Sequence, residues 1–357
     1  MTARHHSFAL LLLGLLAFAC KSTAPVSVPP PGTTDSSATV RTTDSVLCSF
    51  VVLGCNRLDK ADAAASGDPS TANLVQLDRT FADVMKLSPR PDLLFLAGDL
   101  ILGKVNDAPT LDAQLSGWRA HYEASPIAAS GIRLVVIPGN HETNDGDPSG
   151  VGESEWVKVM APYIPFSNGP SVGGPDGSLT DQSHLTGSFD LGPVHFILLN
   201  TDAASQSGQV PVRWLAGDLA STAAARASHT FVLAHRPAYA WNGKLSEGIA
   251  QPYRDSLWQL LSSHKVEAMF AAHNHIYRRL QPTSTTWMVI AGNGGSSLAS
   301  PTGADRNFGF TRVLIHKSGA VELIAYGREY GAKYTDPSPE SLYPTTVRDT
   351  ASLTRTW

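Results

Sequence analysis

Cysteine is scarce in this chain: 357 residues contain three, Cys20, Cys48 and Cys55. Cys48 and Cys55 stand at the two ends of one apolar segment that we expect to form a strand. Such a strand separates their Cα atoms by about 23 Å, whereas a disulfide needs about 5.5–6 Å. The two cysteines cannot pair if that strand forms, so the sequence indicates a fold that is not built on disulfides.

Charge is also sparse. Charged residues make up 16% of the chain, and 27 Lys and Arg against 31 Asp and Glu give a formal net charge of −4. The basic residues form no stripe, so the sequence does not indicate nucleic acid as a partner. Hydrophobic residues make up 42% of the chain, as in an ordinary globular protein. The oligomeric state has no signal in the sequence.

A twelve-residue apolar run, Phe8 to Ala19, is too short to span a bilayer as a mature helix but suits a signal peptide. It follows Arg4 and ends directly before Cys20, similar to a bacterial lipoprotein signal that is cut before a lipidated cysteine. Lys21 resembles the residue found there in lipoproteins sent to an outer membrane. We expect residues 1–19 to be a signal peptide and the protein to be an exported lipoprotein, at the outer membrane or facing the periplasm. Ordinary secretion is the alternative.

Three further regions are expected. Residues 20–45 are rich in Ser, Thr and Pro and have too little apolar content to fold, which predicts a tether, with membrane contact only through the N-terminal lipid. The folded domain is expected over residues 46–334. The polar, Pro-containing residues 335–357 favour a tail that is draped over the domain or disordered.

Within the domain, short apolar runs of strand length alternate with segments of helical periodicity. Helices are expected over residues 74–85, 108–124, 211–224 and 253–264. This alternation is typical of an α/β fold.

Four apolar runs end in side chains that bind metals. The four stretches are Gly98-Asp99, Gly139-Asn140-His141-Glu142, Ala234-His235-Arg236-Pro237 and Ala272-His273-Asn274-His275. The preceding runs are typical of strands buried in an α/β sheet, and ligands of such sheets sit at the carboxyl ends of the strands. The four ends are therefore expected to converge, and a mixed set of oxygen and nitrogen ligands favours a divalent or trivalent metal.

The residue types suit two neighbouring metals. The Asp99 carboxylate can bridge them, His235, His273 and His275 offer imidazole nitrogens, and Asn140 adds a neutral oxygen. Two metals a few ångströms apart produce hydroxide at neutral pH and clamp the oxygens of a phosphoryl group.

His141 directly follows one of these ligands. Adjacent residues of a strand point to opposite faces, so His141 is not expected to bind the same ion. Its side chain titrates in a useful range, and we interpret it as the general acid for the leaving oxygen.

These motifs resemble those of the calcineurin-like metallophosphoesterases, and within them the purple acid phosphatase-like branch. The resemblance covers about residues 46 to 330 and is extended by Trp214-Leu215-Ala216-Gly217-Asp218-Leu219 and Gly292-Asn293-Gly294-Gly295. It implies a four-layer α/β/β/α sandwich with two metal ions (Fe, Zn, Mn or Mg). On this mapping Asp99 bridges the ions, Asn140, His235 and His273 complete one metal, and His275 belongs to the other.

The first motif departs from the family pattern. An Asp and, two residues on, a His or a substitute are usual there, whereas this chain has Cys55 and Arg57. The tyrosine usual three residues after the second motif's Asp is replaced by Leu102. Cys55 is either a metal ligand, because thiolates bind zinc and iron well, or a small buried hydrophobe. If it is not a ligand, the centre has a full ligand set for one metal only.

Two arginines are candidates for substrate binding. Arg57 has only donors and forks well onto phosphate, so we expect it to contact a phosphate oxygen and to stabilise the transferring charge. Arg236 is expected to line the substrate entrance, with a purely structural role as the alternative. Asn140 is the third residue expected to face the substrate.

The sequence therefore predicts a metal-dependent hydrolase of small-molecule phosphate esters. Hydroxide held at Asp99 and the metals would attack phosphorus, with His141 as the acid. A phosphodiesterase or nucleotidase shares the same predicted centre. A mononuclear or catalytically silent ligand-binding lipoprotein is a second alternative, motivated by Cys55 and Arg57, and a surface adhesion or scaffold role is a third.

Overall fold

The computed structural model describes residues 44–283 and 285–354. The predicted signal peptide and nearly all of the predicted tether lie outside the described residues. Across the part of the chain that is described, no helix is long and apolar enough to cross a membrane.

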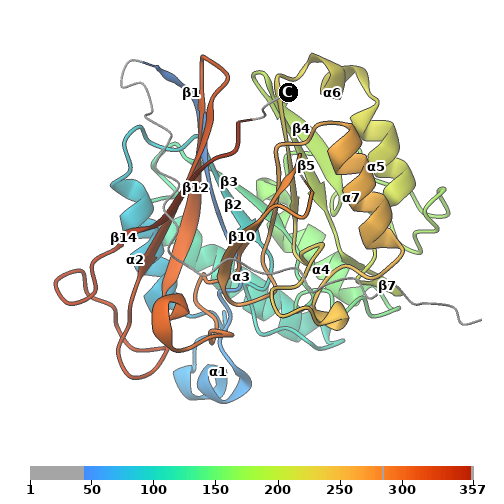
Figure 1. Ribbon diagram of the computed structural model, residues 1–357. Coiled ribbons are helices and arrows are strands. Elements are labelled where there is room, and N and C mark those ends of the chain that lie inside the picture. Colours follow the sequence, from blue (N-terminus) through green and yellow to red (C-terminus); the bar gives the residue numbers. More distant parts are fainter. Residues whose placement is uncertain (1–43, 284, 355–357) are drawn as a thin grey trace, which may run out of the picture. The chain divides into compact units, whose positions relative to one another are not determined.

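Two six-stranded sheets form the centre of the fold (Figure 1). The first has the order β14-β13-β12-β1-β2-β3, in which β1, β2 and β3 are parallel and β12, β13 and β14 add antiparallel strands at one side. Its strands are β1 (Val46–Leu53), β2 (Leu93–Ala97), β3 (Arg133–Ile137), β12 (Phe308–His316), β13 (Val321–Arg328) and β14 (Thr346–Ser352).

The second sheet has the order β10-β11-β9-β8-β5-β4. Its four middle strands are parallel, and the edge strands β4 and β10 are antiparallel to their neighbours. Its strands are β4 (Gly187–Leu191), β5 (Val194–Leu199), β8 (His229–Ala234), β9 (Ala268–Ala271), β10 (Tyr277–Leu280) and β11 (Trp287–Ala291). A small ribbon of β6 (Asp202–Ala203) and β7 (Gln206–Ser207) follows β5.

The inner faces of the sheets meet in a core of aromatic rings. Phe50 of β1 packs edge-on against Phe95 of β2 and against three rings of the second sheet, with centroids 5.1–5.7 Å apart. Those three rings are Phe196, Phe231 and Phe270. Side chains alternate between the two faces of a strand. The residues next to these rings in the sequence therefore point to the outer faces of the sheets, where other elements must bury them.

Helices cover the outer faces. In the second sheet, Ile197 and Val232 point away from the first sheet and join one apolar cluster with Leu215 of α5 and Leu257 of α7, while α2 and α3 lie beside the first sheet (Figure 1). The helices are α1 (Lys60–Ser66), α2 (Leu74–Met85), α3 (Ala108–Ala124), α4 (Val151–Met160), α5 (Val212–Leu219), α6 (Thr222–Arg226) and α7 (Tyr253–Ser263). The layers are therefore α/β/β/α, as predicted.

One expected helix is divided in two. The segment predicted as one helix over residues 211–224 forms α5 and α6, because the Ser221 side chain accepts a hydrogen bond from Ala224 N at 3.1 Å and starts a new helix. Serine favours such cap positions by bonding to the local backbone.

The C-terminal segment also differs from the expectation. Residues 346–352, predicted to belong to a tail, form β14 at the edge of the first sheet. Asp349 of this strand accepts hydrogen bonds from Tyr277 Oη at 2.7 Å and Arg279 Nε at 2.8 Å. The strand is largely exposed and polar, so its sequence lacks the apolar alternation by which a strand is detected.

Candidate metal centre and active site

The predicted site residues follow the carboxyl ends of neighbouring strands. Cys55 follows β1, Asp99 follows β2, Asn140 and His141 follow β3, His235 follows β8, and His273 and His275 follow β9. Cys55, Asp99 and His273 have φ values of 58°, 58° and 59°. Left-handed backbone costs about 1–3 kcal/mol in a non-glycine residue and is concentrated at functional sites.

Four predicted ligands form the first of two clusters. His235 Nδ1 faces the carbonyl of Ala97 at 2.7 Å, so Nδ1 donates and Nε2 keeps its lone pair. That Nε2 lies 3.0 Å from Asn140 Oδ1 and 3.2 Å from Asp99 Oδ1, and His273 Nδ1 lies 3.0 Å from the same Asn140 oxygen. Asn140 is held in this orientation because its Nδ2 donates to Asp145 at 2.7 Å.

This arrangement fits a cation. His235 Nε2, Asn140 Oδ1 and Asp99 Oδ1 are all acceptors, and acceptors held about 3 Å apart repel one another unless positive charge lies among them. Neighbouring ligands of an octahedral ion with bonds of about 2.0–2.1 Å are also about 3 Å apart. The donor set therefore matches what a metal ion requires.

The second cluster contains Cys55, Asp99 and His275. Their ligand atoms all lie within 4.8 Å of one another. His275 Nδ1 faces the carbonyl of Ser297 at 2.7 Å, so its Nε2 keeps the lone pair. Asp99 belongs to both clusters, in the place of the predicted bridging ligand, and every predicted metal ligand lies in one cluster or the other.

The electrostatics of the clusters keep Asp99 and His273 in the forms that bind a cation, whereas burial and the nearby Asp99 raise the pKa of the Cys55 thiol. Burial raises the pKa of Asp99, but attraction to His235, His141 and Arg57 outweighs burial and lowers that pKa, so the carboxylate is ionised. Burial lowers the pKa of His273 to about 2. The imidazole is therefore neutral over the ordinary pH range and keeps a lone pair.

Glu142 is a site residue to which the sequence assigned no role. It is fully buried, and its carboxylate accepts four backbone N–H groups: Asp99 and Gly139 on one oxygen, at 3.0 and 2.7 Å, and Leu100 and Ile101 on the other, at 2.7 and 3.2 Å. One side chain thus joins the loop after β2 to the loop after β3. Only its place within the Gly139-Asn140-His141-Glu142 motif hinted at this.

Arg236 does not lie where a substrate-entrance residue was expected. The residue is 6% exposed, and its Nε donates to both carboxylate oxygens of Asp202 at 2.8 and 2.9 Å. Its Nη1 lies 3.2 Å from His273 Nε2, and Nη2 lies 3.4 Å from Asp145. The expectation that Arg236 lines the entrance is therefore corrected: Arg236 pairs with Asp202, lies near Asp145, which bonds to Asn140, and lies beside the predicted ligand His273.

An open cavity of about 380 Å³ lies over the two clusters. Six of the predicted site residues line it: Arg57, Asp99, Asn140, His141, His273 and His275. The loop between β8 and α7 adds Trp241, Lys244 and Glu247 to the cavity wall. These three residues were not predicted, because no local sequence pattern places that loop beside the cavity.

Arg57 and His141, for which roles in catalysis are predicted, both line this cavity. Arg57 Nε is buried without a hydrogen-bond partner and lies 3.8 Å from Asp99 Oδ2. His141 Nδ1 donates to the carbonyl of Leu102, so Nε2 remains for a ligand. Burial lowers the pKa of His141 to about 4 in the ligand-free protein.

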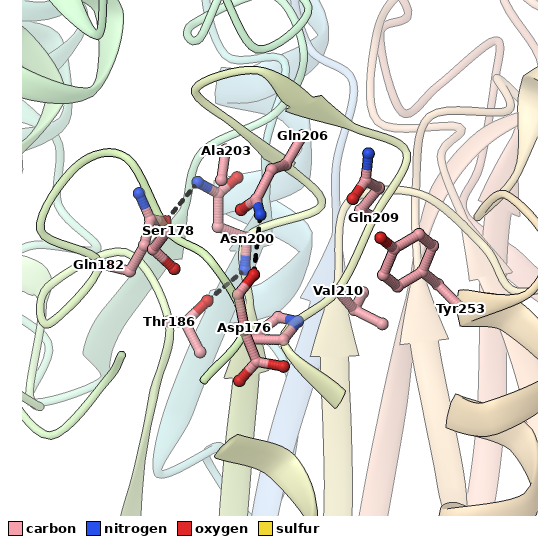
Figure 2. A pocket seen from close by; sticks show the side chains of 11 residues that line it. Asp176, Ser178, Gln182, Thr186, Asn200, Ala203, Gln206, Gln209, Val210 and Tyr253 are labelled. Atoms are coloured by element: carbon pink, nitrogen blue, oxygen red, sulfur yellow. Dashed lines mark hydrogen bonds between the residues drawn. The ribbon is translucent and has the colours of Figure 1, made fainter. Parts of the chain in front are cut away.

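A second, smaller polar cavity lies beside β5 (Figure 2). It has a volume of about 10 Å³, enough for about one water molecule. Asn200 connects two other residues of the cavity wall. Its backbone N–H donates to Thr186 Oγ1 and its Nδ2 donates to Gln182 Oε1, both at 2.9 Å. Asp176 and Gln182 belong to a Gly- and Pro-rich loop between α4 and β4, so this part of the loop borders the small cavity and not the cavity over the clusters.

Comparisons with known proteins agree with this fold. The sequence profile of the calcineurin-like phosphoesterase family matches residues 64–277. Purple acid phosphatase 21 of Arabidopsis thaliana is 27% identical over 225 residues, which cover 61% of this chain and 45% of that protein. The chain thus spans about half the length of this curated relative.

Two solved structures share the fold. A purple acid phosphatase from yellow lupin (Lupinus luteus) seeds superposes with a TM-score of 0.57 at 21% identity, covering 87% of this chain and 54% of that one. A dimetal phosphatase from Danio rerio gives 0.53 at 13% identity, covering 87% of this chain and all of that one.

The layered fold and the clustered ligands at its strand ends define a metallophosphoesterase domain. This chain belongs to the calcineurin-like phosphoesterase family. The predicted family and the predicted fold are both confirmed.

Proposed function

We propose that this protein hydrolyses small-molecule phosphate esters at the cavity over the two clusters. The observation that carries the proposal is the cluster of inward-facing acceptors from His235, Asn140 and Asp99, which needs a cation. Membership of the phosphoesterase family supports it, and so do relatives named as purple acid and dimetal phosphatases, which suggest a dinuclear centre.

Asp99, Asn140, His235 and His273 would hold one metal, and Asp99 and His275 would contribute to the second. When bound, the metals supply Lewis-acid polarisation of the phosphoryl group and acidify water. The oxygen and nitrogen ligands of the first position are compatible with Fe, Zn, Mn or Mg.

Arg57 would bind the phosphoryl group. Arg57 lines the cavity, and its Nε, which has no hydrogen-bond partner, lies 3.8 Å from Asp99 Oδ2. A fixed donor aimed at developing negative charge stabilises the transition state without reorganisation. Lys244 adds a second cation at the cavity mouth, and Trp241 adds an aromatic surface for the ester group.

Glu247 would orient His273, whereas Arg236 would hold the Asp145 side chain that positions Asn140. When Nδ1 of the His273 ring binds metal, its proton lies on Nε2, which Arg236 cannot accept because guanidinium has donors only. Glu247 Oε2, 3.6 Å from that Nε2, is a carboxylate that can accept it. Carboxylates paired in this way fix the ring of a metal-binding histidine.

The direct test is to load the purified full chain with Zn²⁺, Mn²⁺ or Fe²⁺, count metal per chain, and assay phosphomonoesters and diesters. We expect two metals per chain and turnover that chelation abolishes and metal restores. The same panel separates a monoesterase from a phosphodiesterase or nucleotidase. A chain that keeps its metals but hydrolyses no ester would instead be a binding protein.

His141→Ala is expected to lower kcat by about 10²-fold on alkyl phosphates and much less on p-nitrophenyl phosphate. A general acid matters most when the leaving oxygen is strongly basic, and the charge of a bound phosphate favours the protonated imidazole. Steady-state kinetics on both substrates and metal analysis check this, with the exposed His264→Ala as the control. Equal losses on both substrates would contradict the acid role.

Arg236→Lys is expected to lower the metal affinity of the first position by about 10-fold or more. Lysine keeps the charge but cannot bond to both oxygens of Asp202 while also reaching Asp145, which holds the proposed ligand Asn140. Equilibrium dialysis measures the affinity. Arg279→Lys, which breaks a similar ion pair with Asp349 at 2.8 Å, serves as the control and should leave affinity unchanged. Equal loss in both variants would mean that Arg236 acts only through general stability.

A further inference from the structure

The backbone of Cys55 is fixed between the two sheets at the floor of the site. Its N–H donates to the carbonyl of Gly98 at 3.0 Å, and its carbonyl accepts from Ser296 N at 2.9 Å. Gly98 follows a strand of the first sheet and Ser296 a strand of the second. These bonds hold the side chain in one direction, and that side chain is fully buried.

The direction is toward two other ligands. Cys55 Sγ, an Asp99 carboxylate oxygen and a His275 ring nitrogen lie within 4.8 Å of one another. Zinc bonds of about 2.3 Å to sulfur and 2.0–2.1 Å to nitrogen place two ligands of one ion at most about 4.4 Å apart. Small side-chain movements would therefore bring the three atoms onto a common ion.

His275 presents a lone pair to this cluster. Because its Nδ1 donates to the carbonyl of Ser297, its Nε2 is the unprotonated nitrogen, the tautomer that a metal requires. This ring orientation is an observation independent of the cysteine. It supports a metal site at the cluster, because it adds a nitrogen donor to the thiol and the carboxylate.

Charge distinguishes a ligand from an inert cysteine. Among the described residues, Asp99 is the only carboxylate in the two clusters, and by itself it offers one negative charge to two dications. A thiolate at Cys55 adds the second. Cys48, at the other end of β1, is a buried cysteine that belongs to neither cluster, and therefore shows what a structural cysteine looks like in this fold.

We propose that Cys55 is a metal ligand, so that the second position of the centre is a thiolate site formed by Cys55, Asp99 and His275. On binding, the Sγ–H proton leaves to solvent and a sulfur–metal bond forms. Soft thiolate favours thiophilic divalent ions such as Zn²⁺ over Mg²⁺ or Mn²⁺. The two positions of the centre therefore differ in metal preference. The inference rests on the metal centre of the proposed function, but not on turnover.

Cobalt titration of the full chain tests the proposal. Wild type is expected to bind two Co²⁺ and to develop the near-ultraviolet thiolate-to-cobalt charge-transfer absorption. Cys55→Ser should lose that absorption and bind the second Co²⁺ at least about 10–100-fold more weakly. Cys20→Ser and Cys48→Ser are the matched controls and should keep both. Absorption that survives Cys55→Ser, or two bound Co²⁺ without it in wild type, would overturn the proposal.

Cys55→Asp gives a second test that does not depend on loss of folding. The carboxylate keeps the charge but replaces sulfur with oxygen, so two Co²⁺ should still bind without the charge-transfer absorption. Competition dialysis should show that the preference of the second position for Zn²⁺ over Mn²⁺, measured as the ratio of the two affinities, falls by about 10-fold or more. An unchanged preference would count against a thiolate ligand. A wild type with the absorption but no esterase activity would refute the proposed function alone.

Discussion

Asp99→Asn is expected to abolish phosphate ester hydrolysis, with a loss of at least about 10⁴-fold in kcat/KM. The carboxamide would keep the shape of the side chain, but both metal positions would lose their shared anionic ligand. Metal-assisted charge stabilisation contributes several kcal/mol, and about 5–6 kcal/mol corresponds to this loss. The measurement is steady-state kinetics at saturating metal, with metal per chain determined on the same sample.

Stability gives an independent readout of the same substitution. Wild type is expected to gain about 2.7 kcal/mol in free energy of unfolding at a metal concentration 100 times Kd, and Asp99→Asn should gain far less. Asp83→Asn is the control, because Asp83 is a buried carboxylate of α2 that bonds to Arg79 Nε at 3.1 Å, outside the cavity. It should keep metal, activity and the metal-dependent gain. Full activity in Asp99→Asn would remove the basis of the proposed function.

The placement of the ligands was predictable because it follows from local rules. Asp99, Asn140, His235 and His273 each come at or just after the end of a short apolar run, and parallel strands bring such ends to one edge within each of the two sheets. The two-residue spacing of His273 and His275 also carried information, although the structure assigns the two rings to different clusters. These local rules do not show that the edges of the two sheets face each other.

The supporting residues were not predictable, because their roles depend on the direction of side chains across distant segments. Arg236 adjoins a ligand in the sequence, yet its guanidinium turns to Asp202, which lies 34 residues away. Trp241 and Lys244 reach the cavity through a loop whose path no local pattern fixes. The edge strand that carries Asp349 is polar, and only its pairing with β13 reveals it.

Glu142→Gln is expected to cost about 3–5 kcal/mol in free energy of unfolding and to weaken metal binding at the first position by about 10–100-fold. Each Glu142 oxygen accepts two backbone N–H groups. In glutamine one of these atoms becomes an NH₂ donor, so two N–H groups are left facing a donor whichever way the amide turns. Urea unfolding and equilibrium dialysis measure the two effects.

The loss of metal affinity has a cause separate from the loss of stability. The N–H of Asp99 is one of the four donors, and it belongs to the residue whose left-handed backbone, with φ of 58°, aims the bridging carboxylate. Without the Glu142 acceptor that strained conformation loses its support. Glu153→Gln is the matched control, since Glu153 is also buried and accepts from Gln182, Asn200 and Ala204 N at 2.9–3.2 Å. It should destabilise the fold while metal affinity stays unchanged, and equal loss of affinity in both variants would reduce Glu142 to a general stabiliser.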